Sequence, residues 1–307
     1  MSVEFLASGI VPVCVVIMMF GVGLNLTLAS LGGILANPRS LLVATVLQIV
    51  LLPALAIFLI AVFTPAPVVA LALVALAASS GGALSNVFTR LVGGNLALSV
   101  VMTTVTTLLL SATVPAVLAA ALASGALAQG GTARLDPLQV GFDLMRLALL
   151  PIGLGLLIVH VFPRVAGGLR RAADALGVAA FVTVLISTTI VSLPALRQTA
   201  SGPLLYAVLF SLGSLALGVA VSRILPPGDR SACFMEFGLR NLPVALFLAG
   251  SGAPSVELVA LLFCYFLANT AVLLGLALLA RSRPGRVATS AARERAVSAE
   301  DVENAGN

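Results

Sequence analysis

Most of this chain consists of apolar segments that are each long enough to cross a lipid bilayer. A spanning α-helix needs about 20 predominantly apolar residues, and nine such segments follow one another along the sequence. They cover residues 8–29, 39–63, 66–91, 95–124, 137–162, 168–194, 203–225, 229–250 and 254–280. Short turn signals, such as Asn37-Pro38 and Pro226-Pro227-Gly228, separate them. The sequence therefore predicts an all-α polytopic membrane protein with about nine transmembrane helices.

The small number of charged side chains agrees with a chain that lies mostly in the bilayer. Charged residues make up 9% of the 307 positions, as 16 arginines and 11 acidic residues. A water-soluble surface needs about a quarter of its positions charged, so a soluble globular domain is excluded. Because no cluster of basic residues is gathered on one face, a nucleic-acid partner is not expected. The lipid bilayer is the partner that this composition implies.

The same pattern divides the chain into regions. Residues 1–280 form one transmembrane domain, with two halves at about 8–124 and 137–280. Residues 281–307 are polar and charged without apolar periodicity, which predicts a disordered tail. The connections are short, so a separate soluble domain is not expected.

The arginines predict the orientation, because cytoplasmic loops carry an excess of Lys and Arg. With the N-terminus outside, the outer loops hold only Arg134 and Arg197. The inner loops and the tail then hold twelve arginines: Arg39, Arg90, Arg164, Arg170, Arg171, Arg223, Arg230, Arg281, Arg283, Arg286, Arg293 and Arg295. We therefore expect a multi-pass protein of the cell (inner) membrane with an extracytoplasmic N-terminus and a cytoplasmic C-terminus.

Two of the segments are interrupted by polar residues at mid-membrane depth. The third contains the serine- and glycine-rich stretch 79–86, and the eighth contains Glu236, Gly238, Arg240 and Pro243. Pro243 removes a backbone donor and clashes with the carbonyl four residues earlier. Broken backbone at this depth is tolerated where it lines a cavity or is buried in protein. Close helix packing through small residues is an alternative for the first stretch, but charged residues in mid-span are usually functional.

Two interrupted helices at corresponding places in two halves of a chain are typical of an inverted-repeat transporter. Asn86 and Asn241 are 155 residues apart, each in the second-to-last segment of its half. The first half has four segments and the second has five, so the pattern is that of a five-plus-five plan without its first helix.

Five short motifs carry a resemblance to a known family. They are Phe20-Gly21-Val22-Gly23-Leu24, Gln48 with Pro53 five residues on, Gly81-Gly82 before Ser85-Asn86, Gly94-Asn95-Leu96-Ala97-Leu98-Ser99-Val100, and Glu236-Phe237-Gly238-Leu239-Arg240-Asn241. In this order and spacing, from about residue 10 to 280, they resemble the bile acid:sodium symporter family. The resemblance implies a panel domain and a core domain, with two broken helices that cross in the core beside the sodium sites.

The resemblance also implies the residues of a first sodium site. They are Ser85, Asn86, Ser99, Thr103 and Glu236. All five side chains carry oxygen, as a hard cation requires.

A second sodium site in the family corresponds to Gln48, Glu236 and the backbone carbonyls of Phe237 and Leu239, together with a glutamine at the position of Arg240. A guanidinium offers no acceptor, and like charges ~4 Å apart repel by about 4 kcal/mol at an effective dielectric of 20. If the segment continues as a helix, Arg240 lies one turn from Glu236, within ion-pair reach, and substitutes for the second cation. The alternative is that Arg240 points away to an inner aqueous cavity and the second site rearranges.

The substrate region implied by the resemblance lies near the ends of the broken helices and includes Ala83, Leu84, Arg240 and Asn241. Helix N-termini and Arg240 would attract the carboxylate of an organic anion. The lining of Ala, Leu, Val and Gly is compatible with a bile acid-like anion and with a small carboxylate.

The sequence thus predicts a sodium-coupled symporter of an organic anion, with sodium as the co-transported ion and no organic cofactor. One alternative is a proton-coupled or exchange-type carrier on the same fold, with Glu236 as the proton site. Another is a sensor or scaffold whose tail binds a partner. An enzyme is not expected, because the chain shows no nucleophile–base arrangement, Walker loop or dinucleotide fingerprint, and no metal site beyond sodium.

Overall fold

The structure is a computed structural model that describes residues 1–26, 38–123, 125, 136–198, 202–251 and 254–281. Within these ranges the chain is helical, with turns and one short β-bridge. Its elements are α1 (Val3–Phe5), η1 (Leu6–Ile10), α2 (Val11–Asn25), α4 (Pro38–Phe63), α5 (Pro67–Ala78), α6 (Ala83–Leu91), α7 (Leu96–Ala123), α8 (Pro137–Leu144), η3 (Met145–Leu149), α9 (Leu150–Val161), α10 (Pro163–Gln198), α11 (Gly202–Ile224), α12 (Arg230–Gly238), α13 (Leu242–Gly250) and α14 (Val256–Arg281). The two η elements are π-helical turns between α-helices.

Helices of membrane-spanning length occupy most of the segments that the sequence predicts. Among the residues that the structure describes, six helices are long and apolar enough to cross a bilayer: Val3–Asn25, Pro38–Phe63, Pro137–Val161, Pro163–Pro194, Leu204–Ile224 and Val256–Leu279. The bent helix α7 is a seventh if its two parts form one span. The predicted segments 66–91 and 229–250 each form two shorter helices, α5 with α6 and α12 with α13. The all-α multi-pass architecture is confirmed, and the count of nine spans stays a prediction.

The bend in α7 has a cause in the sequence. The axis turns by 61° between Leu96–Leu110 and Ala112–Ala123. Pro115 lies inside this helix, and a proline ring clashes with the carbonyl four residues earlier, which here belongs to Ser111. The bend therefore falls where Pro115 weakens the helix.

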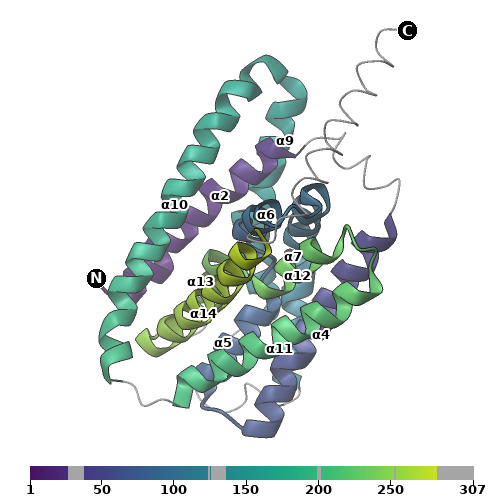
Figure 1. The fold of residues 1–307 in the computed structure, drawn as a ribbon. Helices are drawn as coiled ribbons and strands as arrows, with labels where there is room; N and C mark the ends of the chain where they lie inside the picture. Colours follow the sequence, from purple (N-terminus) through teal and green to yellow (C-terminus); the bar gives the residue numbers. More distant parts are fainter. Residues whose placement is uncertain (27–37, 124, 126–135, 199–201, 252–253, 282–307) are drawn as a thin grey trace.

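The helices form two groups. In the first, α2 packs against both α9 and α10, as Figure 1 shows along one side of the molecule. Glycines allow α2 and α9 to approach closely: a Cβ on Gly23 would lie 2.2 Å from the carbonyl oxygen of Ile152, and one on Gly155 would lie 2.7 Å from the backbone nitrogen of Leu24. Gly23, from the first of the five motifs, thus lies at a helix contact.

The second group surrounds two short helices, α5 and α13, that are buried over most of their length. All ten residues from Val69 to Ala78 in α5 are buried, as are all eight from Leu242 to Ala249 in α13. A helix that is apolar all round belongs in an interior. On α4, by contrast, Leu42, Val46 and Val50 are exposed one turn apart, which is the face expected to contact lipid. The centre of this group is where the two interrupted segments lie.

Two predicted regions fall outside the described residues. The tail 281–307 is described only at Arg281, and the predicted loop 125–136 only at its two ends. The predicted disorder of the tail is therefore not tested.

Candidate functional site

The two interrupted segments meet at their breaks. α5 ends at Ala78 and α6 begins at Ala83, while α12 ends at Gly238 and α13 begins at Leu242. The amide of Gly82 donates to the carbonyl of Leu239 (3.2 Å), and the amide of Asn241 donates to the carbonyl of Ser80 (2.9 Å). These bonds flank an antiparallel bridge between Gly81 and Arg240. The backbone groups that the breaks release therefore bond to each other, as burial at this depth demands.

Each half of one segment also packs on a half of the other. α5 contacts α13 on one side of the bridge, and α6 contacts α12 on the other. The two segments thus cross, and the crossing brings the N-termini of α6 and α13 to the middle of the second helix group. The structure thus has two broken helical segments that contact each other at their breaks.

Local sequence explains where the second break ends. Pro243 is the second residue of α13, where its missing N–H leaves no helical hydrogen bond unmade. Asn241 is the N-cap, and its side-chain oxygen accepts from the amide of Val244 (3.3 Å). The prediction that Pro243 interrupts this segment is confirmed.

Three hydroxyl groups converge on one carboxylate oxygen of Glu236. This side chain lies on α12 and is completely buried. Its Oε1 accepts hydrogen bonds from Ser85 on α6, and from Ser99 (3.1 Å) and Thr103 (2.6 Å) on α7. Ser99 and Thr103 are four residues apart and so share one helical face. The structure therefore brings four of the five residues of the predicted first sodium site into direct contact.

Two oxygens beside this cluster have no partner among the described residues. They are Oδ1 of Asn86, next to Ser85 in the chain, and Oε2 of Glu236; both are buried. A buried acceptor without a partner loses about 1–3 kcal/mol relative to a satisfied one. Oε2 of Glu236 lies against Gly81, where a Cβ would fall 1.7 Å away. The cluster thus has a single negative charge, several neutral oxygens and two oxygens without a partner among the described residues. Such a set of oxygen ligands suits a hard monovalent cation.

The residues of the second predicted site are engaged differently. Gln48 on α4 uses its Nε2 to donate to the backbone carbonyl of Glu236 (2.9 Å), while its Oε1 is buried without a partner among the described residues. The carbonyl of Leu239 accepts from Gly82 across the crossing. Phe237 is buried in the last turn of α12. Of these residues, Gln48 contacts the backbone of Glu236 from α4.

The expected ion pair between Glu236 and Arg240 is wrong. α12 ends at Gly238, and Leu239 is extended, so Arg240 does not lie one helical turn beyond Glu236. Its Nε donates to the carbonyl of Leu76 (3.1 Å) and its Nη2 to that of Ala77 (3.2 Å). These are among the last carbonyls of α5, where the helix dipole is negative. The guanidinium is 5% exposed, so it does not extend into open water either.

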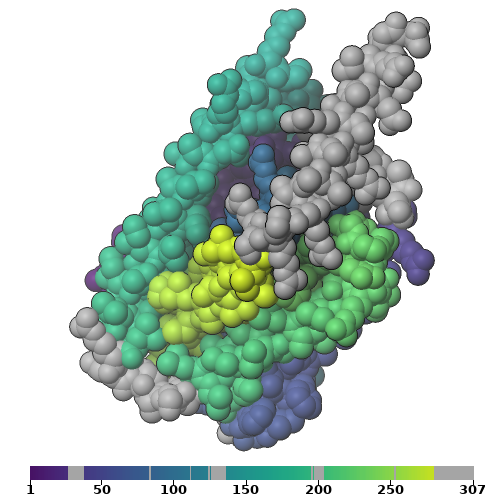
Figure 2. Space-filling model, in the orientation of Figure 1, coloured from purple at the N-terminus to yellow at the C-terminus, as the bar shows by residue number. Residues whose placement is uncertain are grey.

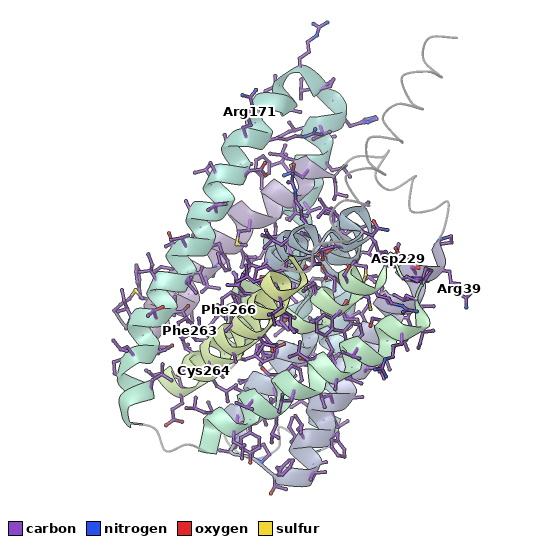
Figure 3. All side chains as sticks on the ribbon, in the orientation of Figure 1. Arg39, Arg171, Asp229, Phe263, Cys264 and Phe266 are labelled. Carbon is purple, nitrogen blue, oxygen red and sulfur yellow. The ribbon has the colours of Figure 1, made fainter. Side chains whose placement is uncertain are left out.

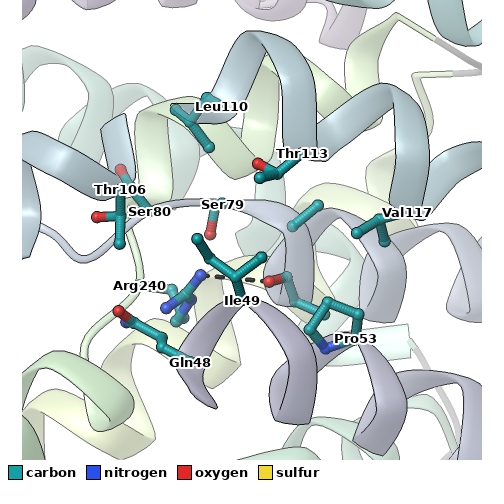
Figure 4. A pocket seen from close by; sticks show the side chains of 12 residues that line it. Gln48, Ile49, Pro53, Ser79, Ser80, Thr106, Leu110, Thr113, Val117 and Arg240 are labelled. Atoms are coloured by element: carbon teal, nitrogen blue, oxygen red, sulfur yellow. Dashed lines mark hydrogen bonds between the residues drawn. The ribbon is translucent and has the colours of Figure 1, made fainter. Parts of the chain in front are cut away.

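The remaining predicted substrate residues lie at the helix N-termini. Ala83 is the first residue of α6, Leu84 follows it, and Asn241 caps α13. The structure brings these positions to the crossing but separates them from the side chain of Arg240, which lines a pocket that none of the three lines (Figure 4).

Sequence reasoning missed residues that hold the crossing in place. On α14, the hydroxyl of Tyr265 (3.2 Å) and Nδ2 of Asn269 (2.6 Å) both donate to the carbonyl of Gly238, where α12 ends. On α7, the hydroxyl of Thr107 donates to the carbonyl of Thr103 (2.6 Å) and lies 3.1 Å from the hydroxyl of Ser80. Asn269 could have been found from the sequence, because an amide side chain in the middle of a span indicates a hydrogen-bond partner inside the helix bundle.

Comparison with known proteins agrees with this geometry. The sequence model of the sodium bile acid symporter family matches residues 12–199, more than half of the chain. Human sodium/bile acid cotransporter 4 is 29% identical over 229 residues, which is 74% of this chain and 52% of the relative. A probable sodium/metabolite cotransporter of the Arabidopsis thaliana chloroplast is 28% identical over 236 residues, 76% of this chain and 57% of the relative.

The chain is also similar to a sodium-dependent organic anion transporter of Bos taurus. The two are 29% identical over 148 residues, which is 48% of this chain and 38% of the relative. The chain spans about half the length of the human and plant relatives. These relatives are named as transporters rather than enzymes. Since the family model covers more than half of its residues, the chain belongs to the sodium bile acid symporter family.

Proposed function

We propose that this protein is a secondary active transporter that couples the entry of sodium to the transport of an organic anion. The observation that carries the proposal is the convergence of Ser85, Ser99 and Thr103 on Glu236, beside the unpartnered oxygen of Asn86. Sodium would bind among these five side chains. A proton needs one carboxylate oxygen, whereas a hard cation needs several oxygens around it, so the cluster favours sodium over the proton-coupled alternative.

We further propose that one sodium ion is carried in each cycle. Arg240 places a fixed positive charge in the crossing, held by two carbonyls of α5. It occupies the position at which the resemblance implies a neutral ligand to a second sodium. Glu236, Arg240, one sodium ion and a monovalent anion sum to zero charge. A second sodium would leave an uncompensated charge in a buried site.

The substrate would bind where the N-termini of α6 and α13 meet, near Leu84 and Asn241. Helix N-termini carry partial positive charge and unpaired amides, which suit a carboxylate. Figure 2 shows the near face hollowed between α10 and α14, with part of α2 at the base of the recess. We infer that a bile acid-like anion or a small carboxylate reaches the crossing between the two helix groups.

The two helix groups would act as the panel and the core of an inverted-repeat transporter. α2, α9 and α10 would form the panel, and the helices around α5 and α13 the core. With α5–α6, α7 and α12–α13 each counted as one span, nine spans result. Figure 3 shows Arg39 and Arg171 toward the end of the bundle opposite the part of α14 that carries Phe263 and Cys264, and we propose that this arginine-rich end faces the cytoplasm.

Cysteine labelling tests the orientation. In a background without Cys14, Cys233 and Cys264, Ser2→Cys is expected to react with an impermeant thiol reagent added to intact cells, and Ser290→Cys only after permeabilisation. If the reagent added to intact cells labels Ser290→Cys but not Ser2→Cys, the orientation is the opposite of the proposed one.

Uptake of a radiolabelled organic anion into proteoliposomes tests the coupling ion. We expect uptake to follow an inward sodium gradient at equal pH on both sides, and to be unaffected by an inward proton gradient without sodium. Uptake that follows only the proton gradient would support the carrier with Glu236 as its proton site instead. Empty liposomes measure the leak of the anion.

A further inference from the structure

A small pocket lies beside the crossing, between α4 and α7. Residues of three elements and both breaks line it. The polar lining consists of Gln48, Ser79, Ser80, Thr106, Thr113 and Arg240. Figure 4 shows Arg240 between Gln48 and the end of α5, with its hydrogen bond to that end dashed. The pocket is thus lined by uncharged side chains and one guanidinium, that of Arg240.

One nitrogen of this guanidinium is unused. Nε and Nη2 of Arg240 donate to Leu76 and Ala77, whereas Nη1 is buried and has no partner among the described residues. A guanidinium has five N–H donors in a fixed fork. A buried donor of a charged group without an acceptor is costly. The side chain is therefore held by two of its nitrogens with the third available to a ligand.

The donors and charge around the pocket favour an anion. None of the residues lining it is acidic, so no carboxylate of the lining competes for Nη1. Apolar side chains such as Ile49, Pro53 and Leu110 complete the wall and would strengthen an electrostatic contact by excluding water. The pocket is small, so it suits one small group rather than a whole bile acid-like molecule.

We propose that this pocket binds a small monovalent anionic group, of halide or carboxylate size, on Nη1 of Arg240. The pocket is separate from the cluster around Glu236, since neither Glu236 nor Ser85, Ser99 or Thr103 lines it. It is equally separate from Leu84 and Asn241 at the helix N-termini. The pocket therefore offers an anion a contact that neither the sodium site nor the helix N-termini supply.

Thermal stability of the full-length protein in detergent tests the proposal. The chain lacks tryptophan, but the buried Cys14 and Cys233 allow unfolding to be followed with a thiol-reactive dye. At constant sodium and ionic strength, gluconate is replaced by chloride, bromide or acetate. A ligand that binds only the native state raises its stability, so we expect a saturable rise of about 3 °C or more for an anion that fits.

Three variants accompany the wild type. Arg240→Gln is expected to abolish the rise, and Arg223→Gln, an exposed arginine on α11, to leave it unchanged. Thr113→Val removes one lining hydroxyl without touching the charge and is expected to weaken the anion about fivefold, the value of one hydrogen bond. If Arg240→Gln does not fold, the result for Thr113→Val decides.

A response to chloride and bromide that acetate does not reproduce would identify a halide site. A response to acetate alone would identify a subsite for the carboxylate of the substrate. The proposal would be overturned if none of the three anions gave a saturable response in the wild type. It would also be overturned if Thr113→Val and a folded Arg240→Gln both responded as strongly as the wild type. Stabilisation by sodium, measured in gluconate, reports on the cation site independently.

Discussion

Replacement of Glu236 by glutamine is expected to abolish sodium-dependent uptake while the protein remains folded and inserted. Glutamine keeps an oxygen that can accept from Ser85, Ser99 and Thr103, so the hydrogen bonds of the crossing can persist. What it removes is the negative charge of the cluster. Loss of one partner from a buried charge pair costs about 3–5 kcal/mol, and 1.4 kcal/mol is tenfold in affinity, so sodium should bind at least about a hundredfold more weakly.

Glu257→Gln is the matched control, because Glu257 is an exposed carboxylate in the first turn of α14. It is expected to transport like the wild type. The measurement is sodium-dependent uptake per molecule of reconstituted protein, with size-exclusion profiles to confirm folding. Near-normal sodium-dependent uptake by Glu236→Gln would refute the assignment of this carboxylate to the ion site.

Replacement of Gly81 by alanine is expected to have nearly as large an effect on transport. A Cβ at this position would fall 1.7 Å from Oε2 of Glu236 and 2.8 Å from the carboxyl carbon. Either the carboxylate turns away from Ser85, Ser99 and Thr103, or the bridge between Gly81 and Arg240 opens. Overpacking of this kind costs about 1–3 kcal/mol. We expect the sodium concentration for half-maximal uptake to rise by about fivefold to a hundredfold.

Gly177→Ala controls for the loss of a glycine. A Cβ on Gly177, within α10, would meet nothing within 4 Å, and alanine favours a helix interior by about 1 kcal/mol over glycine. It should leave the sodium dependence unchanged and raise thermal stability slightly. Wild-type sodium dependence in Gly81→Ala would show that Glu236 does not need its present position.

The positions of the helices could be predicted from the sequence because apolar length and turn residues determine them. Every predicted segment corresponds to a helix or to a broken pair of helices. The second break was also predictable, since Pro243 cannot continue a helix from Leu239. The grouping of α2 with α10 could not be predicted from local pattern, because it depends on contacts between segments far apart in the chain.

The direction of Arg240 depends on a detail that the sequence does not determine. Two more helical residues after Gly238 would bring the guanidinium toward Glu236, whereas the extended Leu239 turns it toward the end of α5. The partners of Gly238 on α14 are equally non-local, since Asn269 lies 31 residues away. The residues of the cluster around Glu236 could be predicted because the family resemblance supplied them. They come from three helices that no local sequence pattern connects.

The sodium dependence of uptake at a controlled membrane potential tests one-sodium symport most directly. Carrying one sodium with a monovalent anion moves no net charge, whereas a second sodium would add about 2.3 kcal/mol of driving force per 100 mV. In proteoliposomes with an imposed potassium diffusion potential, we predict a Hill coefficient near one and a rate that does not respond to the potential. A coefficient near two with uptake accelerated by an inside-negative potential, or uptake that ignores sodium, would contradict the account.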